Sequence, residues 1–190
     1  MEPIQKKILK LSNGFLIVGI IGLINFLLII IFISLEFFGV MSFPYDNIIS
    51  SSFGLIISIV VFYLMFNGLK NLGMESSVDL KFYSWSKLII IFYPISSGLT
   101  FLLYVELPAI IALVVFIIFI SMVIIGYISL LFLGLYIFKI GKEISQKAIL
   151  FGGILLIIFG LIQFFLISFI WMACILLFIG LRKYLIELSI

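Results

Sequence analysis

Few residues in this chain could do chemistry, and their types exclude most enzymatic mechanisms. The sequence contains no histidine and a single cysteine, Cys174. Serine–histidine and cysteine–histidine catalysis, histidine-based metalloprotease chemistry and histidine-ligated haem are therefore excluded. A zinc site would have to combine one thiolate with carboxylates, which is not a usual zinc ligand set. We expect no catalytic residue, no metal and no cofactor, and predict that the chain is not an enzyme.

Two further catalytic signatures are missing from the sequence. An intramembrane aspartyl protease needs two aspartates at membrane depth, whereas the only two aspartates here, Asp46 and Asp79, fall in separate predicted loops. The glycine-rich motifs that cradle phosphates, GxxxxGK[ST] and GxGxxG, do not occur either. The sequence therefore gives no support to nucleotide binding.

The remaining polar candidates are two amides and three carboxylates. Asn25 falls near the middle of the first apolar run, and Gln163 falls in the last one. Either amide could bind a substrate, or could hydrogen-bond to a neighbouring helix, which is the commoner role and contributes about 0.6–2 kcal/mol in a membrane. The carboxylates Glu36, Asp46 and Glu106 lie near the ends of apolar runs. They would form a cation-attracting mouth on the outer face or simply keep the outer loops polar, and we favour the second role.

Composition indicates the elements that must position these residues. Hydrophobic residues make up 66% of the 190 positions, charged residues make up 10%, and the mean hydropathy is +1.51. A soluble domain is only about half apolar, because it must cover its surface with polar groups. We predict an all-α, polytopic transmembrane helical bundle in the cell membrane, with residues 1–190 forming one domain. The first apolar run is too long for a signal sequence, so we expect an uncleaved first span.

Apolar runs predict where the chain crosses the membrane. The runs at 11–38, 48–69, 88–104 and 109–138 are each long enough, or nearly so, to cross about 30 Å of hydrocarbon. The last run, 148–181, could form one helix of about 50 Å or two helices of about 15 residues and 22 Å each. Length alone does not distinguish these two arrangements.

The distribution of basic residues favours two helices in the last run. Cytoplasmic loops are enriched in lysine and arginine. With the N-terminus inside and a terminal hairpin, all eleven basic residues fall on the inner face, whereas a single last helix would place Arg182 and Lys183 outside. We therefore predict about six membrane segments in three hairpins, with both termini in the cytoplasm and Gln163 at the last turn (163–168). The hairpins cover about 11–69, 82–138 and 148–181.

The tetrapeptide F-x-G-L occurs three times, each time shortly before a basic segment. The three copies are FNGL, FLGL and FIGL, and they begin at residues 66, 132 and 178. The recurrence is either a hairpin repeat or a chance match among abundant residue types, and we favour the repeat. Its glycines, Gly68, Gly134 and Gly180, would allow close approach between helices.

The segment VDLKFYSWSK (78–87) mixes apolar and aromatic residues with lysines. This pattern is typical of a short amphipathic helix on the inner membrane surface, where lysines attract anionic headgroups. A docking loop for a protein partner is the alternative. Tyrosine and tryptophan in this chain suit interfacial anchoring, and Cys174 suits a buried apolar position.

One resemblance can be drawn from the hairpin endings. Gly68-Leu69, Gly134-Leu135 and Gly180-Leu181, with the GGILLIIFG stretch at 152–160, resemble features of small multi-pass membrane proteins of archaeal type. That resemblance implies a helical membrane bundle and no particular activity.

These observations together lead to an expected function without catalysis. We expect an accessory or scaffold subunit of a membrane assembly, whose partners are the lipid bilayer and other membrane proteins and not nucleic acid. The alternative is a small-solute permease or a substrate-binding membrane subunit, for which Asn25 and Gln163 would supply polar contacts.

Overall fold

The computed structural model describes residues 3–38, 66, 68–74, 78–89, 91–92, 95, 99, 107–166 and 170–189. Within these ranges the chain forms helices and no strand, which confirms the predicted all-α class. The labelled helices are α1 (Pro3–Phe37), α3 (Leu80–Ser86), α5 (Ala109–Glu143), α6 (Lys147–Leu166) and α7 (Ile170–Glu187).

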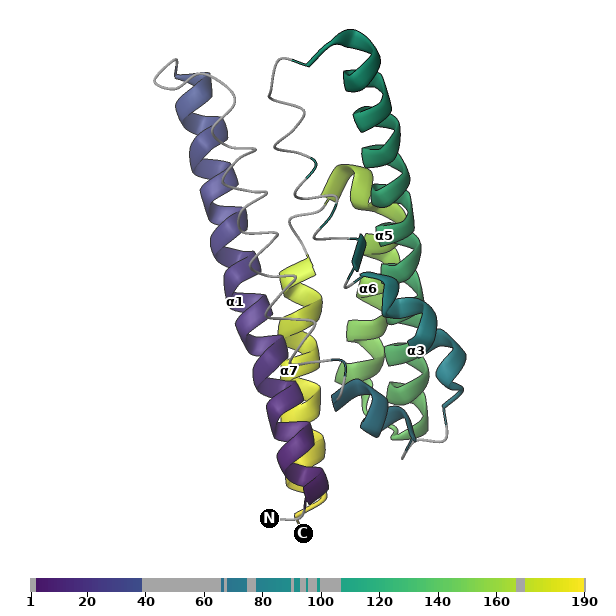
Figure 1. Ribbon diagram of the computed structural model, residues 1–190. Coiled ribbons are helices and arrows are strands. Elements are labelled where there is room, and N and C mark those ends of the chain that lie inside the picture. The colour runs from purple at the N-terminus through teal and green to yellow at the C-terminus, as the bar shows by residue number, and fades with distance from the viewer. Residues whose placement is uncertain are drawn as a thin grey trace.

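The helices pack in a row that differs from their order in the sequence. α1 lies against α7, α7 against α6, α6 against α5, and the short α3 against α5 (Figure 1). Both termini lie at the same end of the molecule, and α1 and α5 diverge toward the opposite end (Figure 1). The first helix of the chain is therefore held by the last one.

The last apolar run forms two helices and not one. α6 has 20 residues and α7 has 18, so they measure about 30 Å and 27 Å along their axes. Both are longer than the 15 residues we expected, because α6 begins at Lys147 and α7 continues through the basic residues to Glu187. The expected turn at 163–168 is displaced as well: helix α6 continues to Leu166, so Gln163 lies within α6.

The turn between α5 and α6 is compact and uses no glycine. Ser145 has a positive φ of 55°. Its N–H donates to the carbonyl of Lys142 at 3.2 Å, and the N–H of Gln146 donates to the carbonyl of Gly141 at 3.0 Å. This pair of hydrogen bonds around a left-handed residue is the Schellman ending of a helix. It reverses the chain directly into α6.

Among the described helices, two are long and apolar enough to cross a membrane. They are α1, over Gln5–Leu28, and α5, over Ala109–Glu143, while the apolar helix Lys147–Phe159 in α6 is shorter. The start of α5 at Ala109 agrees with the predicted run, which begins after a proline. The predicted spans at 48–69 and 88–104 fall mostly outside the described residues.

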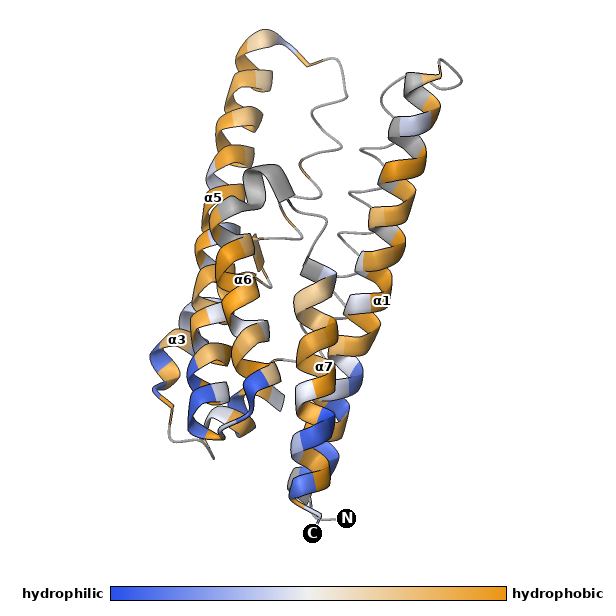
Figure 2. Ribbon diagram, turned by 180° about the vertical axis from the view of Figure 1, so that it is seen from behind, coloured by the Kyte–Doolittle hydropathy of each residue, from blue (hydrophilic) through white to orange (hydrophobic). Residues whose placement is uncertain are grey.

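The outer surface of the long helices is apolar. On α5, Ile110 is 79% exposed and Leu113 is 59% exposed, and Figure 2 shows apolar residues along most of α1 and α5. The exposed hydroxyls of Ser34 and Ser121 donate to the carbonyls four residues earlier, at 2.8 and 2.9 Å. Such internal hydrogen bonds satisfy a hydroxyl that has no water nearby.

All eleven basic residues are exposed and belong to segments at the end where both termini lie (Figure 2). We call this the basic end. The residues are Lys6, Lys7, Lys10, Lys70, Lys81, Lys87, Lys139, Lys142, Lys147, Arg182 and Lys183.

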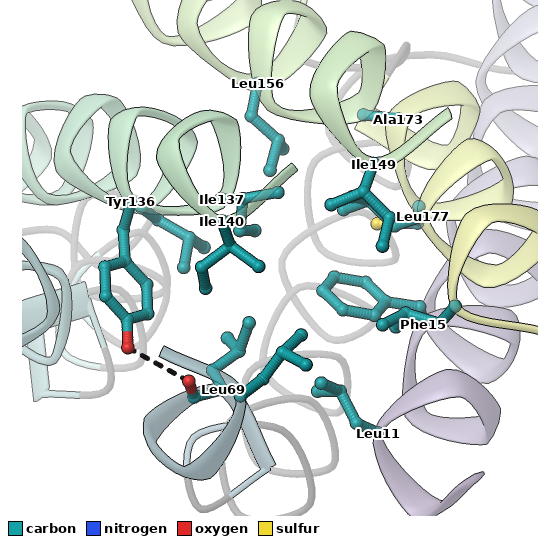
Figure 3. Close-up of a cluster of buried hydrophobic side chains, with 14 of the residues drawn as sticks. Leu11, Phe15, Leu69, Tyr136, Ile137, Ile140, Ile149, Leu156, Ala173 and Leu177 are labelled. Carbon is teal, nitrogen blue, oxygen red and sulfur yellow. Dashed lines mark hydrogen bonds between the residues drawn. The ribbon is translucent and has the colours of Figure 1, made fainter. Parts of the chain in front are cut away.

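The described core lies in the half of the molecule nearest the basic end. Leu11 and Phe15 of α1 meet Ile137 and Ile140 of α5 and Leu177 of α7 around a common centre (Figure 3). A void of about 10 Å³ lies between them, and its lining is wholly apolar. This volume is at the lower limit for one water molecule and offers it no hydrogen-bond partner, so the centre of the core is dry.

Close contacts at glycines set the spacing of these helices. A Cβ built on Gly153 would lie 2.5 Å from the backbone nitrogen of Phe138, and one on Gly134 would lie 2.8 Å from the nitrogen of Ile157. A Cβ on Gly180 would lie 2.9 Å from the nitrogen of Ile149. These backbone atoms cannot swing aside as the end of a side chain can, so each contact requires glycine.

The other F-x-G-L glycine makes a similar contact. A Cβ on Gly68 would lie 2.8 Å from the Cβ of Leu11 in α1. All three F-x-G-L glycines are therefore buried against another helix, as close approach between helices requires. The leucines differ, since Leu69 and Leu181 are buried whereas Leu135 is half-buried.

We expect Gly153→Ala to destabilise the protein by about 1–3 kcal/mol, because α5 and α6 must separate to admit the methyl group. Gly126→Ala is the matched control in α5: among the described residues no atom lies within 4 Å of a Cβ built there. Alanine is favoured over glycine within a helix, so this variant should keep or slightly raise the melting temperature. Thermal unfolding in detergent measures both, and equal melting temperatures for Gly153→Ala and the parent would contradict the contact.

Candidate functional site

The polar residues singled out from the sequence lie on different helices or outside the described residues. Asn25 and Glu36 both lie in α1, 11 residues and therefore about 16 Å apart along the axis. Gln163 lies in α6, and α7 separates α6 from α1 (Figure 1). The side chains of these three residues lie outside the description. Asp46 and Glu106 lie outside the described residues altogether.

Two buried tyrosines form the polar arrangement that the structure does show. Tyr83 of α3 is 4% exposed and Tyr136 of α5 is fully buried. The hydroxyl of Tyr83 donates to the carbonyl of Phe66, and that of Tyr136 to the carbonyl of Leu69, each at 3.0 Å. Figure 3 shows the second of these bonds at one side of the cluster of buried side chains. The two rings are 5.6 Å apart between centroids, and we call the pair the tyrosine clamp.

The clamp depends on α3 and on a gap left by a glycine. Asp79 caps α3, because its carboxylate accepts the N–H of Lys81 at 2.9 Å. The hydroxyl of Ser86 donates to the carbonyl of Tyr83 at 2.7 Å. On the other side, a Cβ at Gly73 would occupy the position of the Tyr136 hydroxyl. Phe66 and residues 68–74 are thereby held between α3 and α5 by both tyrosines.

The chemistry of the clamp is structural. Both hydroxyls donate to backbone carbonyls and lie in apolar surroundings. Burial raises the pKa of Tyr83, because the charged phenolate would lose its hydration. A neutral phenol that donates to a backbone carbonyl holds that part of the backbone in place.

A second set of polar contacts joins the ends of the helices at the basic end. The guanidinium of Arg182 donates to the side-chain oxygen of Asn13 at 2.9 Å, which links α7 to α1. The amide of Gln5 donates to the carbonyl of Leu188 at 3.3 Å. The buried Gln146, in the α5–α6 turn, donates to the carboxylate of Glu187. These contacts join the ends of the helices.

The burial of the aromatic residues and of the cysteine corrects one prediction from the sequence and agrees with others. Tyr83 and Tyr136 are buried, so the expectation that tyrosines serve as interfacial anchors is wrong for these two. Trp85 is 55% exposed, as an anchoring residue must be. Cys174 is buried among apolar residues, as predicted. The sequence did not predict the clamp, because the residues around each tyrosine do not indicate that its hydroxyl donates to a carbonyl distant in the chain.

Within the described residues, no group of three potential metal ligands comes together. Comparisons with protein-family models, with curated proteins and with solved structures yield no match. The resemblance to archaeal-type membrane proteins remains a prediction.

We expect Tyr83→Phe to lower the free energy of unfolding by about 0.5–1.5 kcal/mol at neutral pH, the usual contribution of one hydrogen bond. Ser84→Ala, which removes an exposed hydroxyl from the same helix, is the control and should have little effect.

The stability difference between the parent and Tyr83→Phe should also depend on pH. The pKa of Tyr83 is raised in the folded state. Its contribution to the free energy of unfolding is therefore complete below the pKa of the unfolded chain, about 10, and is lost as pH rises through the pKa of the folded state. The stability difference between the parent and Tyr83→Phe should therefore narrow above about pH 10. A difference that widens with alkaline pH would contradict this assignment.

Proposed function

We propose that this chain is a multi-pass integral protein of the cell membrane, and that it serves as a non-catalytic accessory or scaffold subunit of a membrane assembly. Its six membrane segments form three hairpins with both termini in the cytoplasm. The observation that carries the membrane assignment is the apolar exterior of α1 and α5 above a single basic end.

The apolar exterior supports lipid as the surrounding solvent. Side chains such as Ile110, Leu113 and Ile117 are each more than half exposed on successive turns of α5. Monomeric soluble proteins rarely expose large contiguous apolar surfaces of this kind. The internally bonded hydroxyls of Ser34 and Ser121 also suit a medium without water.

The basic end supports the orientation. Lysine and arginine accumulate on the cytoplasmic side of membrane proteins. The exposed basic side chains of α1, α5, α6 and α7 lie where both termini lie. The division of the last run into α6 and α7 brings Arg182 and Lys183 to that same end, as three hairpins require.

The scaffold role is supported by the packing of the core. Among the described residues, side chains meet at the centre of the core, and the void of about 10 Å³ lined by Leu11, Phe15 and Ile140 is far smaller than a solute. Backbone contacts at glycines hold the helices at fixed spacing. A rigid bundle of this kind presents constant surfaces to neighbouring membrane proteins.

Topology provides the first test. A reporter fused after Ile190 should read cytoplasmic, and the same reporter fused to a chain truncated after Phe38, at the far end of α1, should read external. The protein should also stay in the membrane fraction after alkaline extraction. An external signal from the Ile190 fusion would contradict the three-hairpin arrangement.

Assembly provides the second test. After gentle solubilisation, native mass spectrometry should show a species heavier than the 21.6 kDa chain, containing a co-purifying protein. A stable monomer without any partner would argue against the scaffold role. A thermal shift with one member of a panel of small solutes would favour the permease or substrate-binding alternative.

A further inference from the structure

We infer that the exposed surface around α3, together with Lys139 of α5, binds the headgroup of an anionic phospholipid in the leaflet at the basic end. We call this the α3 surface and define it by four exposed residues: Lys81 and Trp85 of α3, Lys87 directly after α3, and Lys139. The inference depends on the membrane location proposed above and adds a particular lipid chemistry at a particular place.

The position of Trp85 along α5 marks the level of the interface. Its ring stacks on Phe132 of α5, with centroids 5.8 Å apart and planes 26° apart. One turn farther from the basic end, Ile128 is 45% exposed and apolar. Seven residues toward the basic end, about 10 Å along the axis, lies the exposed Lys139. A half-exposed tryptophan between an apolar and a basic zone is typical of the headgroup level.

Aromatic rings hold two of the lysines beside α3. The ammonium of Lys139 lies 3.9 Å from the ring centroid of Phe82, and that of Lys87 lies 4.7 Å from the ring centroid of Tyr83. Such cation–π contacts orient an ammonium group without neutralising its charge. Both lysines remain exposed and therefore keep their capacity to bind an anion.

The third lysine lies on the same side as the tryptophan. Lys81 and Trp85 are separated by four residues in α3, so they share one face of the helix, and both are exposed. A lipid whose acyl chain contacts Trp85 would bring its phosphate to the lysine side chains.

Few negative charges compete for these lysines. Among the described residues, none of the three ammonium groups forms an ion pair with a carboxylate. The nearest acidic residues along the chain are Asp79, whose carboxylate caps α3, and Glu143, one turn beyond Lys139. A positively charged surface at headgroup level attracts anionic lipid by about 1 kcal/mol per lysine, which corresponds to about fivefold in affinity.

The chain carries its own reporter for this site. It contains two tryptophans, so Trp171→Phe leaves Trp85 as the only indole. The full-length Trp171→Phe protein is reconstituted in vesicles that contain phosphatidylglycerol or phosphatidylcholine brominated near the headgroup end of the acyl chains. Quenching of Trp85 emission, measured as one lipid replaces the other, gives the preference for the anionic lipid.

We expect a preference for phosphatidylglycerol of at least about fivefold at low salt, decreasing as ionic strength rises. Changing Lys81, Lys87 and Lys139 to glutamine should abolish the preference, and changing them to arginine should keep it. The matched control changes Lys6, Lys7 and Lys183 to glutamine, which removes three exposed charges from the α1–α7 side of the same end and should leave the preference intact.

Three outcomes would overturn the inference. Equal quenching by both lipids would show that Trp85 lies in the membrane without headgroup selection, and the proposed membrane location would stand. If both triple glutamine variants lost the preference for phosphatidylglycerol equally, the basic end would attract anionic lipid in general and there would be no localised site. If neither brominated lipid quenched Trp85, the inference would be overturned, and the result would also count against placing α3 at the membrane surface.

Discussion

The fold depends on helices that approach until backbone meets backbone. Gly134 and Gly153 face each other across α5 and α6, and Gly180 makes a similarly close contact between α7 and the backbone of α6. In lipid there is no hydrophobic force to press helices together, so close packing must supply the association energy. This spacing lets side chains from α1, α5 and α7 meet around one dry centre. A methyl group at these glycines would open that centre.

The same packing produces a molecule with two unlike ends. The described core, the tyrosine clamp and the contacts between helix ends all gather near the basic end. Away from it, α1 and α5 diverge and present apolar side chains outward. Hydrogen bonds and interlocked side chains therefore hold the half with the basic end together. The described helices of the other half mainly present exposed apolar side chains.

Hydropathy predicted the helical class, the start of α5 at Ala109 and the collection of basic residues at one end. Hydropathy did not predict where α5 ends. The apolar run stops at residue 138, but the helix continues through Lys139 and Lys142 to Glu143, because lysine is a good helix former. The Ser145 turn contains neither glycine nor proline and so gave no signal. The tyrosine clamp was not predictable either, since the carbonyl that Tyr136 binds lies 67 residues away.

The pairing of α1 with α7 has a consequence for biosynthesis. Gly19 and Gly22 of α1 pack against Ile175 and Trp171 of α7, about 150 residues later in the chain. At about 5–20 residues per second, a ribosome needs roughly 8–30 s to make that interval. At the membrane location proposed above, α1 therefore remains without its α7 neighbour until almost all of these 190 residues have been synthesised. Assembly of the bundle is completed by its last helix, and a chain that stops before α7 leaves α1 without the neighbour it was shaped to fit.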